Sequence, residues 1–486
     1  MLFHTWAFVA FFLIVYAGFR LLRGTRAEMP WLLGASYLFY GAWNPLYLVL
    51  ILYTTSVDYY AVTRMARSRR RGMWLAFSVV NSLLVLGFFK YRHFAAENIN
   101  LLLDWAGVPL AVPVVNELLP WLTADINSSL AAMGLHYTVP GLGDLPVGIS
   151  FFTFQSMSYT IDFYRGHCDR EPSFIRYATF VSFFPQLVAG PIERSTNLLR
   201  QLGQVQPITR TDVADGLSLF LVGLFKKVAL ADYLAQYVDK VYAVPGNWHA
   251  PALVLATFAF SWQIYFDFSG YTDMARGLGR MMGFRLMLNF NNPYLADSLG
   301  DFWRRWHISL STWFRDYVYI PMGGSRRSTW AIYRNMVLTM VISGLWHGAE
   351  WGFVIWGLLH AAGRAATRKL EQTSLYRDRV PRPLKQALVF AFVTFAWIFF
   401  RARSWSKAWT IIERIFTSGW GDPQFPILAM AMILAIWAYQ HAYESRWGRG
   451  ILELAAVRVA AAIAMAVYLA TFIAPGAAQA FIYFQF

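Results

Sequence analysis

The residues MVISGLWHGAEWGFVIWGLLHA (340–361) are apolar over roughly the length that crosses a bilayer, about 20 residues. His347 interrupts this otherwise apolar run. Gly344, Gly348 and Gly352 recur every four residues, so on a helix they share one face and let a neighbouring helix approach closely. The run therefore predicts a membrane-embedded helical segment that packs against another helix.

The composition of the whole chain agrees with this interpretation. Of its 486 residues, 57% are apolar and 14% are charged, against roughly a quarter charged in a soluble domain. Apolar runs of membrane-spanning length recur along the chain and predict an all-α polytopic membrane protein with about ten to twelve embedded helices. The runs lie near residues 3–22, 31–63 (interrupted), 73–90, 147–164, 176–192, 216–235, 252–270, 334–363 (interrupted), 386–400, 427–443 and 453–474.

Basic residues predict how the chain is oriented. No Lys or Arg precedes the first apolar run and no small-residue cleavage signal follows it, so we expect a retained helix rather than a removable signal peptide. Lys and Arg favour cytoplasmic loops, which places both the N-terminus and the C-terminus on the non-cytoplasmic side. The basic stretches used for this assignment are 20–26, 64–71, 364–385 and 446–458.

The excess of basic residues is assigned to topology. The chain has 42 Lys and Arg against 27 Asp and Glu, but these charges lie in short loops between apolar spans. That position favours membrane topology and anionic lipid over nucleic acid, with an anionic cytosolic ligand as the alternative. No stretch marks a separate soluble domain, so residues 1–486 are predicted to form one membrane-embedded domain. Cys168 is the only cysteine and no H-E-x-x-H motif is present, so no metal site is expected.

A second segment, DFWRRWHISLSTWFRDYVYIPMGG (301–324), is too polar for a simple membrane span. Written as one helix, it carries an aromatic stripe beside a polar stripe that contains His307, which predicts a re-entrant or interfacial helix. It is either an amphipathic surface helix whose arginines bind lipid phosphate, or a cavity wall that holds an anionic ligand such as a phosphorylated cofactor. The candidate ligand-binding arginines are Arg304, Arg305 and Arg315.

His347 is the candidate for chemistry. An ionisable side chain at membrane depth normally faces the protein interior and is functional. Imidazole is also a natural general base near neutral pH, able to take a proton from an attacking hydroxyl. His360 falls on another face of a straight helix and is interpreted as a packing histidine. The chain has no G-x-S-x-G nucleophile elbow and no P-loop, so chemistry must use histidine and a supplied hydroxyl.

Four motifs occur in order along the chain: VGISFFTFQSMSYTIDFYRG (147–166), FFPQLVAGPIER (183–194), DFWRRWHISLSTWFRDYVYIPMGG (301–324) and SGLWHGAEWGFVIWGLLH (343–360). Together they resemble the membrane-bound O-acyltransferase family, and within it the bacterial branch with the alginate O-acetyltransferase membrane subunit and the D-alanyl-transfer protein of teichoic acid modification. The resemblance implies tilted helices around a central tunnel, entered by a cytosolic acyl thioester and by an acceptor hydroxyl from the other side. It also implies that His347, in the W-H-G motif, is the essential histidine and that His307, in the R-W-H-I-S motif, is the second catalytic histidine.

The residues FIYFQF (481–486) carry one hydroxyl, on Tyr483. Aromatic residues are common at the membrane surface, so one interpretation is an interfacial anchor. By resemblance, a short terminal aromatic motif with a tyrosine carries the acyl group as an ester in this branch. The tail, residues 475–486, is therefore a candidate acyl relay in which Tyr483 accepts the acyl group with help from His347.

The resemblance implies transfer of an acetyl group from a cytosolic thioester, most simply acetyl-CoA, for O-acetylation of an exopolysaccharide such as alginate or cellulose. No permanently bound cofactor is expected. The expected partners are an SGNH-type O-acetyltransferase in the periplasm or outside the cell and the machinery of polysaccharide synthesis and export, and the expected location is the bacterial cytoplasmic (inner) membrane. D-alanyl or other acyl transfer from a carrier protein is the alternative enzyme. A transporter or flippase is the alternative from another class, although the sequence shows no two related halves.

Overall fold

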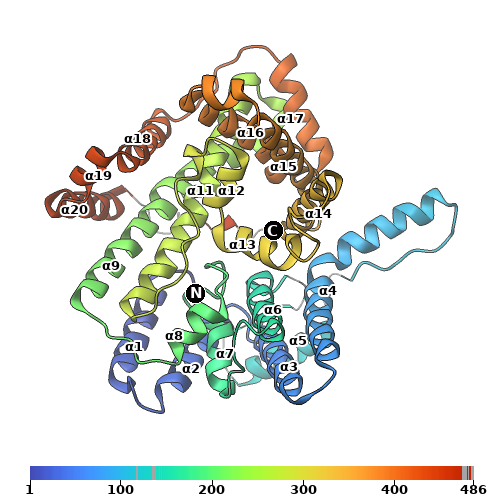
Figure 1. Ribbon diagram of the computed structural model, residues 1–486, viewed down its shortest axis with the longest axis vertical. Helices are drawn as coiled ribbons and strands as arrows, with labels where there is room; N and C mark the ends of the chain where they lie inside the picture. The colour runs from blue at the N-terminus through green and yellow to red at the C-terminus, as the bar shows by residue number, and fades with distance from the viewer. Residues whose placement is uncertain are drawn as a thin grey trace. The chain divides into compact units, whose positions relative to one another are not determined.

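The computed structural model describes residues 1–115, 119–133, 138–141, 143, 145–472, 479 and 481–482. Over these residues the secondary structure is helical and contains no strand (Figure 1), which confirms the all-α prediction for the described part. The chain divides into two compact units, formed by Met1–Thr209 with Met282–Leu286 and by Arg210–Met281 with Met287–Phe486. The single membrane domain expected over residues 1–486 stays a prediction.

In the first unit, the interrupted apolar run 31–63 forms parts of two helices. The break expected in this run falls between α2 and α3. Pro45 restricts the backbone of Asn44 there, and the Asn44 side chain accepts a hydrogen bond from Leu46 N–H at 3.0 Å. The helices of this unit are α1 (Trp6–Leu22), α2 (Glu28–Gly41), α3 (Tyr47–Arg67), α4 (Arg71–Trp105), α5 (Pro120–Ala132), α6 (Ile149–Arg165), α7 (Phe174–Ser182) and α8 (Arg200–Leu202), with the π-helical turn η1 (Ser195–Leu199) before α8.

A buried carboxylate joins the helices of the first unit. Asp58 on α3 is fully buried and accepts hydrogen bonds from Ser78 on α4, at 2.6 Å, and from Ser156 on α6. The Ser156 hydroxyl also shares a hydrogen bond of 2.7 Å with Tyr177 on α7. Buried polar groups are stable when hydrogen bonded, so this network holds the four helices in register.

The second unit contains the two segments singled out in the sequence. Its helices are α9 (Arg210–Phe225), α10 (Asp232–Ala243), α11 (Ala250–Met281), α12 (Leu299–Arg305), α13 (Ile308–Phe314), α14 (Thr329–His347), α15 (Trp351–Leu370), α16 (Arg382–Ala402), α17 (Trp405–Thr417), α18 (Ile427–Glu444), α19 (Arg446–Leu452) and α20 (Ala455–Phe472). Between them lie the π-helical turns η2 (Lys226–Ala231), η5 (Arg315–Tyr319) and η6 (Leu375–Arg379) and the 3₁₀ turns η3 (Pro245–Asn247) and η4 (Pro293–Leu295). The interruption expected in the run 334–363 falls between α14 and α15.

Glycines bring α9 and α11 into backbone contact. A Cβ on Gly216 would lie 2.7 Å from the carbonyl oxygen of Gly277, and a Cβ on Gly223 would lie 2.5 Å from that of Gly270. Only residues without side chains allow two helices to approach so closely. This contact also holds α11 against η2, the turn that follows α9.

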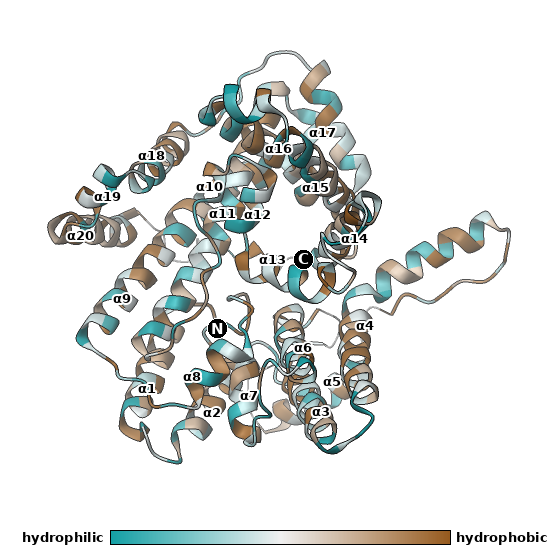
Figure 2. Ribbon diagram, in the orientation of Figure 1, coloured by the Kyte–Doolittle hydropathy of each residue, from teal (hydrophilic) through white to brown (hydrophobic). Residues whose placement is uncertain are grey.

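Among the described residues, three helices are long and apolar enough to cross a membrane, namely α4, α16 and α20, and α1 is apolar but shorter. Figure 2 shows hydrophobic residues recurring along helices of both units. No described residue of α20 is buried, and Val459, Ile463 and Val467 are each more than half exposed. Such an apolar surface suits contact with lipid. The larger number of embedded helices, about ten to twelve, and their tilt around a tunnel stay predictions.

Candidate active site

The segment 301–324 does not form the single helix that its stripes predict. Helix α12 ends at Arg305, α13 begins at Ile308, and Trp306 and His307 form a turn between them. His307 has a φ of 42°, in the left-handed region that few residues other than glycine adopt. Both residues of the turn are buried. The expectation of one continuous helix is therefore wrong at His307.

Asn289 accounts for this turn. Its side-chain oxygen accepts hydrogen bonds from the Ser309 backbone N–H at 3.2 Å and from the Ser309 hydroxyl at 2.8 Å. Its backbone carbonyl accepts a hydrogen bond from Ile308 N–H at 2.9 Å. These contacts satisfy backbone groups that a continuous helix would have satisfied internally. They also offset a left-handed conformation that costs about 1–3 kcal/mol at a non-glycine residue.

The same asparagine sets the hydrogen position on His307. His307 Nδ1 lies 3.1 Å from Asn289 Oδ1. The atom on Asn289 must be the oxygen, because the Ser309 backbone N–H that it also contacts can only donate. Nδ1 of His307 therefore carries the hydrogen, and in the neutral ring Nε2 presents a lone pair.

His347 is the last residue of α14 rather than an interior residue of a longer helix. Gly348 follows in extended conformation, and α15 begins three positions further at Trp351. The residue is 4% exposed, and its ring centroid lies 5.2 Å from that of Trp356 and 5.1 Å from that of Phe400. His347 is thus surrounded by aromatic rings at the end of a helix.

The glycine spacing predicted a close helix contact, which is confirmed at Gly344. A Cβ there would overlap the carbonyl oxygen of Phe353, so the neighbouring helix is α15, the next helix of the chain. Gly352 serves a second contact, since a Cβ there would overlap the carbonyl oxygen of Arg403, just after α16. These contacts hold α14, α15 and the end of α16 together near His347.

The indole of Trp346 connects the two candidate histidines. Its ring centroid lies 6.0 Å from that of His307 and 5.0 Å from that of His347. Phe268 of α11 also packs on His307, with ring centroids 4.6 Å apart. The structure therefore brings together two histidines that are far apart in the sequence.

A cavity of about 250 Å³ lies next to this cluster, lined by α12, α13, η5, α14 and α15. Its lining residues on α14 lie at positions i, i+3, i+4 and i+7 and therefore share one helix face: Met336, Thr339, Met340 and Ser343. His347 lies one turn beyond Ser343 and is not itself among the residues that line the cavity. Arg315, Arg364 and Arg368 also line the cavity and give it positive charge. Guanidinium groups of this kind suit phosphate.

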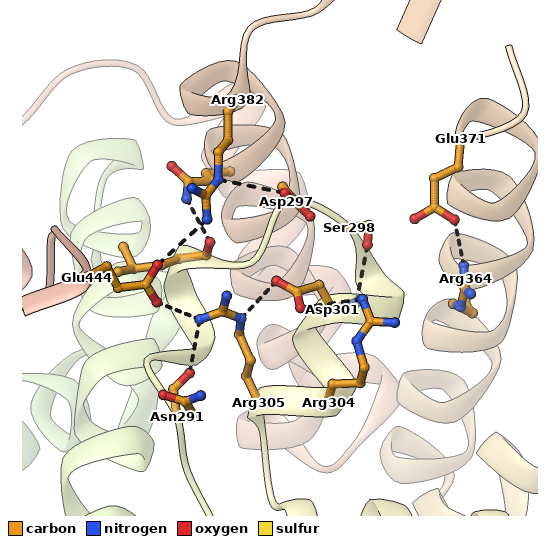
Figure 3. Close-up of polar contacts among 12 residues, drawn as sticks. Asn291, Asp297, Ser298, Asp301, Arg304, Arg305, Arg364, Glu371, Arg382 and Glu444 are labelled. Atoms are coloured by element: carbon orange, nitrogen blue, oxygen red, sulfur yellow. Dashed lines mark hydrogen bonds and ion pairs between the residues drawn. The ribbon is translucent and has the colours of Figure 1, made fainter. Parts of the chain in front are cut away.

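The structure separates the three arginines that the sequence grouped. Arg315 lines the cavity, and its side chain is 59% exposed. Arg305 instead lies 2.8 Å from Asp301 and 2.6 Å from Glu444, in the ion-pair cluster drawn in Figure 3. Arg304 is 73% exposed and lies 3.5 Å from Asp301. A role of Arg304 and Arg305 in ligand binding stays a prediction.

Arg364 and Arg368 were not singled out because the stretch 364–385 was interpreted as a loop. The structure corrects this interpretation, since α15 continues to Leu370 and carries both arginines along the cavity. Figure 3 shows Arg364 facing Glu371, at 3.4 Å, apart from the cluster around Arg305. Part of this basic stretch thus faces a cavity.

Tyr483, the third predicted catalytic residue, lies outside the described residues. Two residues directly before it are described, and Phe481 and Ile482 are both buried. Over the part of the chain that the structure describes, no group of three or more His, Cys, Asp or Glu side chains is placed to hold a metal ion.

Comparison with known proteins adds the family. The model of MBOAT, the membrane-bound O-acyltransferase family, matches residues 149–405, a range that contains both His307 and His347. The chain belongs to this family. A protein of Pseudomonas aeruginosa named as a probable alginate O-acetylase is 40% identical over 423 residues, which cover 86% of this acyltransferase and 75% of that protein. The resemblance drawn from the four motifs is confirmed.

The names of two other relatives give different acyl groups and acceptors. A peptidoglycan O-acetyltransferase of Helicobacter pylori is 33% identical over 449 residues, covering 85% of this chain and 79% of the relative. A teichoic acid D-alanyltransferase of Bacillus subtilis is 27% identical over 345 residues, covering 67% of this chain and 84% of the relative. Membership of the family therefore fixes the class of reaction, acyl transfer, while the relatives' acyl groups and acceptors vary.

Proposed function

We propose that this acyltransferase takes an acetyl group from a cytosolic thioester, most simply acetyl-CoA, for O-acetylation of an exopolysaccharide such as alginate or cellulose. The observation that carries the proposal is the arginine-lined cavity that follows one face of α14 toward His347. The names of the relatives at 40% and 33% identity also favour acetyl over D-alanyl, which appears in the name of the relative at 27%.

The donor enters the cavity between α13 and α15. Arg315, Arg364 and Arg368 bind its phosphate groups, because a guanidinium presents several donors in a fork that matches phosphate oxygens. The cavity, about 250 Å³, is smaller than the roughly 300–1,000 Å³ of sites that enclose a drug-sized ligand. It therefore holds the thioester arm, and the nucleotide end of the donor stays outside it.

His347 acts as the general base. It takes the proton of the acceptor hydroxyl as the hydroxyl oxygen attacks the thioester carbonyl, the C–S bond breaks, and the proton then passes to the departing thiolate. His307 orients the acceptor, because its Nε2 lone pair accepts a hydrogen bond when Nδ1–H is directed to Asn289. Polarisation of the thioester carbonyl by His307 would require a protonated ring.

Tyr483 is the first acceptor in this proposal and carries the acetyl group as an ester. A partner transferase of the SGNH type, on the outer side of the bacterial inner membrane, then passes the group to the polysaccharide. Polysaccharide synthesis and export machinery supplies the polymer. This order requires the C-terminus of the acyltransferase to lie on the non-cytoplasmic side, as the basic loops predict.

The test is peptide-level mass spectrometry of the purified protein after exposure to acetyl-CoA, with His347→Ala alongside. We expect one acetyl group on Tyr483 in the parent protein and none in the variant. Equal labelling of both proteins would overturn the role of His347. If acetyl-CoA is consumed while the tail stays unmodified, Tyr483 is an interfacial anchor. Transfer only from a D-alanyl-loaded carrier protein would replace acetyl by D-alanyl.

A further inference from the structure

Lys227, Asp232 and Asp267 form a buried ionic cluster in the second unit. Nζ of Lys227 lies 2.8 Å from Asp232 and 2.5 Å from Asp267, and the three side chains are 1%, 7% and 5% exposed. The cluster arises from the local fold. Lys227 lies in the π-helical turn η2, whose backbone hydrogen bonds join residues five apart, and Asp232, the first residue of α10, follows it by five positions on the same side of the chain. The close contact of Gly223 with Gly270 brings α11, which carries Asp267, against this face.

The charges of this cluster do not balance. One ammonium group faces two carboxylates, which leaves an excess negative charge in a buried place. Burial of such a charge is costly unless further donors satisfy the carboxylate oxygens. The adjacent cluster on the same two elements has the opposite balance, because Asp273 faces Lys226 at 2.6 Å and Arg276 at 3.6 Å. Only the cluster at Lys227 therefore requires additional donors.

The segment near the C-terminus supplies these donors. The Gln479 backbone N–H donates to Asp232 Oδ2 at 3.3 Å, and the Ile482 backbone N–H donates to Asp267 Oδ2 at 2.8 Å. A hydrogen bond to an ionised acceptor is stronger than a neutral one.

The ring of Phe481 completes the contact. It is 1% exposed, and Lys227 Nζ lies 4.6 Å from its centroid, within the range of a cation–π interaction. The ring of Tyr271 meets it edge to face, with centroids 4.7 Å apart. All three members of the cluster thus contact the same short segment.

We propose that Lys227, Asp232 and Asp267 are a docking site for a short segment with a buried aromatic side chain, here the segment that carries Gln479, Phe481 and Ile482. We further propose that docking positions Tyr483 for acyl transfer, a step that rests on the proposed function. Ile482 contacts Asp267, and His307 packs on Phe268, the next residue of α11. The docked segment and His307 therefore contact adjacent residues of the same helix. Tyr483 follows Ile482 directly, and consecutive Cα atoms are about 3.8 Å apart. Docking of Ile482 therefore limits where the Tyr483 hydroxyl reaches.

The experiment measures the mobility of the tail without any donor. A spin label is attached to Gln485→Cys in the full-length protein, with Cys168, the only natural cysteine, replaced by serine. Electron paramagnetic resonance then compares Phe481→Ala, Asp267→Asn and Lys227→Met with the parent. We expect an immobilised label in the parent and a rotational correlation time several-fold shorter in the three variants. Phe481→Ala changes only the tail, so its effect does not depend on the folding of a changed cluster.

Lys226→Met is the matched control, because Lys226 lies beside Lys227 on η2 and pairs with Asp273. We expect the label to stay as immobile in this variant as in the parent. A label that is equally mobile in Phe481→Ala and in the parent would overturn the docking site. Release of the tail by Lys226→Met to the same extent as by Lys227→Met would also overturn it.

Acetylation of Tyr483 is measured in parallel on unlabelled Phe481→Ala protein with its natural Gln485. Loss of acetylation together with release of the tail supports the positioning role. Undiminished acetylation with a released tail overturns that role. If the parent tail is docked but Tyr483 is never acetylated in any protein, the docking site stands and the relay of the proposed function fails.

Discussion

Two histidines in this acyltransferase contact the same indole and have different surroundings. The ring centroid of Trp356 lies 5.2 Å from that of His347 and 4.7 Å from that of His360. His360 is fully buried in the middle of α15, Phe302 and Trp303 pack on it, and neither ring nitrogen has a hydrogen-bond partner among the described residues. His347 ends α14 one turn beyond Ser343, which lines the cavity, and His360 lies one turn before Arg364, which also lines it. Burial among aromatic rings and closeness to the cavity therefore do not distinguish the two histidines, whereas the end of a helix and the shared contact with Trp346, which also packs on His307, are specific to His347.

The largest expected effect separates these two histidines. His347→Ala is expected to lower the rate of acetyl transfer about 10²- to 10⁴-fold, the usual contribution of a general base. His360→Phe keeps an aromatic ring in the same packing and is expected to leave the rate nearly unchanged. The measurement is the initial rate of transfer of labelled acetyl from acetyl-CoA by protein reconstituted in liposomes. Equal loss in both variants would remove the distinction between the two positions.

The second prediction concerns the arginine-lined cavity. Arg364→Ala and Arg368→Ala each remove one donor group for phosphate, and a hydrogen bond to a charged group contributes about 1.5–3 kcal/mol. KM for acetyl-CoA is therefore expected to rise about tenfold to a hundredfold in each variant, with kcat little changed. Steady-state kinetics over a range of acetyl-CoA concentrations measures both constants.

Arg304→Ala is the control for the cavity arginines, because Arg304 is 73% exposed and is not among the cavity residues. We expect its KM to match that of the parent protein. A rise equal to that of Arg364→Ala would place the donor along α12 instead and restore the grouping of Arg304 with Arg315. Arg305→Ala is a poorer control, since this change would also remove the shorter ion pairs of Asp301 and Glu444, which would keep Arg304 at 3.5 Å and Arg382 at 3.6 Å.

Local patterns in the sequence predicted most helix positions and drew attention to His307 and His347, whose catalytic roles stay predictions. Apolar runs and breakers such as Pro45 act on neighbouring residues, so they can be recognised without knowledge of the fold. His347 was identified because it interrupts an apolar run, and this signal does not depend on whether the helix continues or ends there. The glycines around His347 likewise predicted the contact of α14 with α15 through their spacing alone.

The features that the sequence did not reveal depend on distant residues. The turn at His307 requires Asn289, from the segment before η4, and helix periodicity in 301–324 carries no information about that residue. The arginines were grouped because they are neighbours in the sequence. The position of Asp301 and Glu444 directs Arg305 away from this group, while α15 brings Arg364 to the cavity. Both the turn at His307 and the positions of the arginines thus depend on residues that are distant in the sequence and close only in the folded protein.

The smallest expected effect tests the helix contact that supports His347. Gly344→Ala places a methyl group against the Phe353 carbonyl and is expected to destabilise the protein by about 1–3 kcal/mol, the usual cost of overpacking. Gly87→Ala in α4 is the matched control, since no atom lies within 4 Å of a Cβ there and alanine favours a helix by roughly 0.5–1 kcal/mol. Thermal unfolding in detergent should therefore show a lower Tm for Gly344→Ala and an equal or higher Tm for Gly87→Ala.

The α14–α15 contact also holds His347 beside Trp356, so Gly344→Ala should reduce the acetyl-transfer rate while the protein remains folded. An unchanged rate in folded, destabilised protein would mean that this contact stabilises the fold without positioning the histidine.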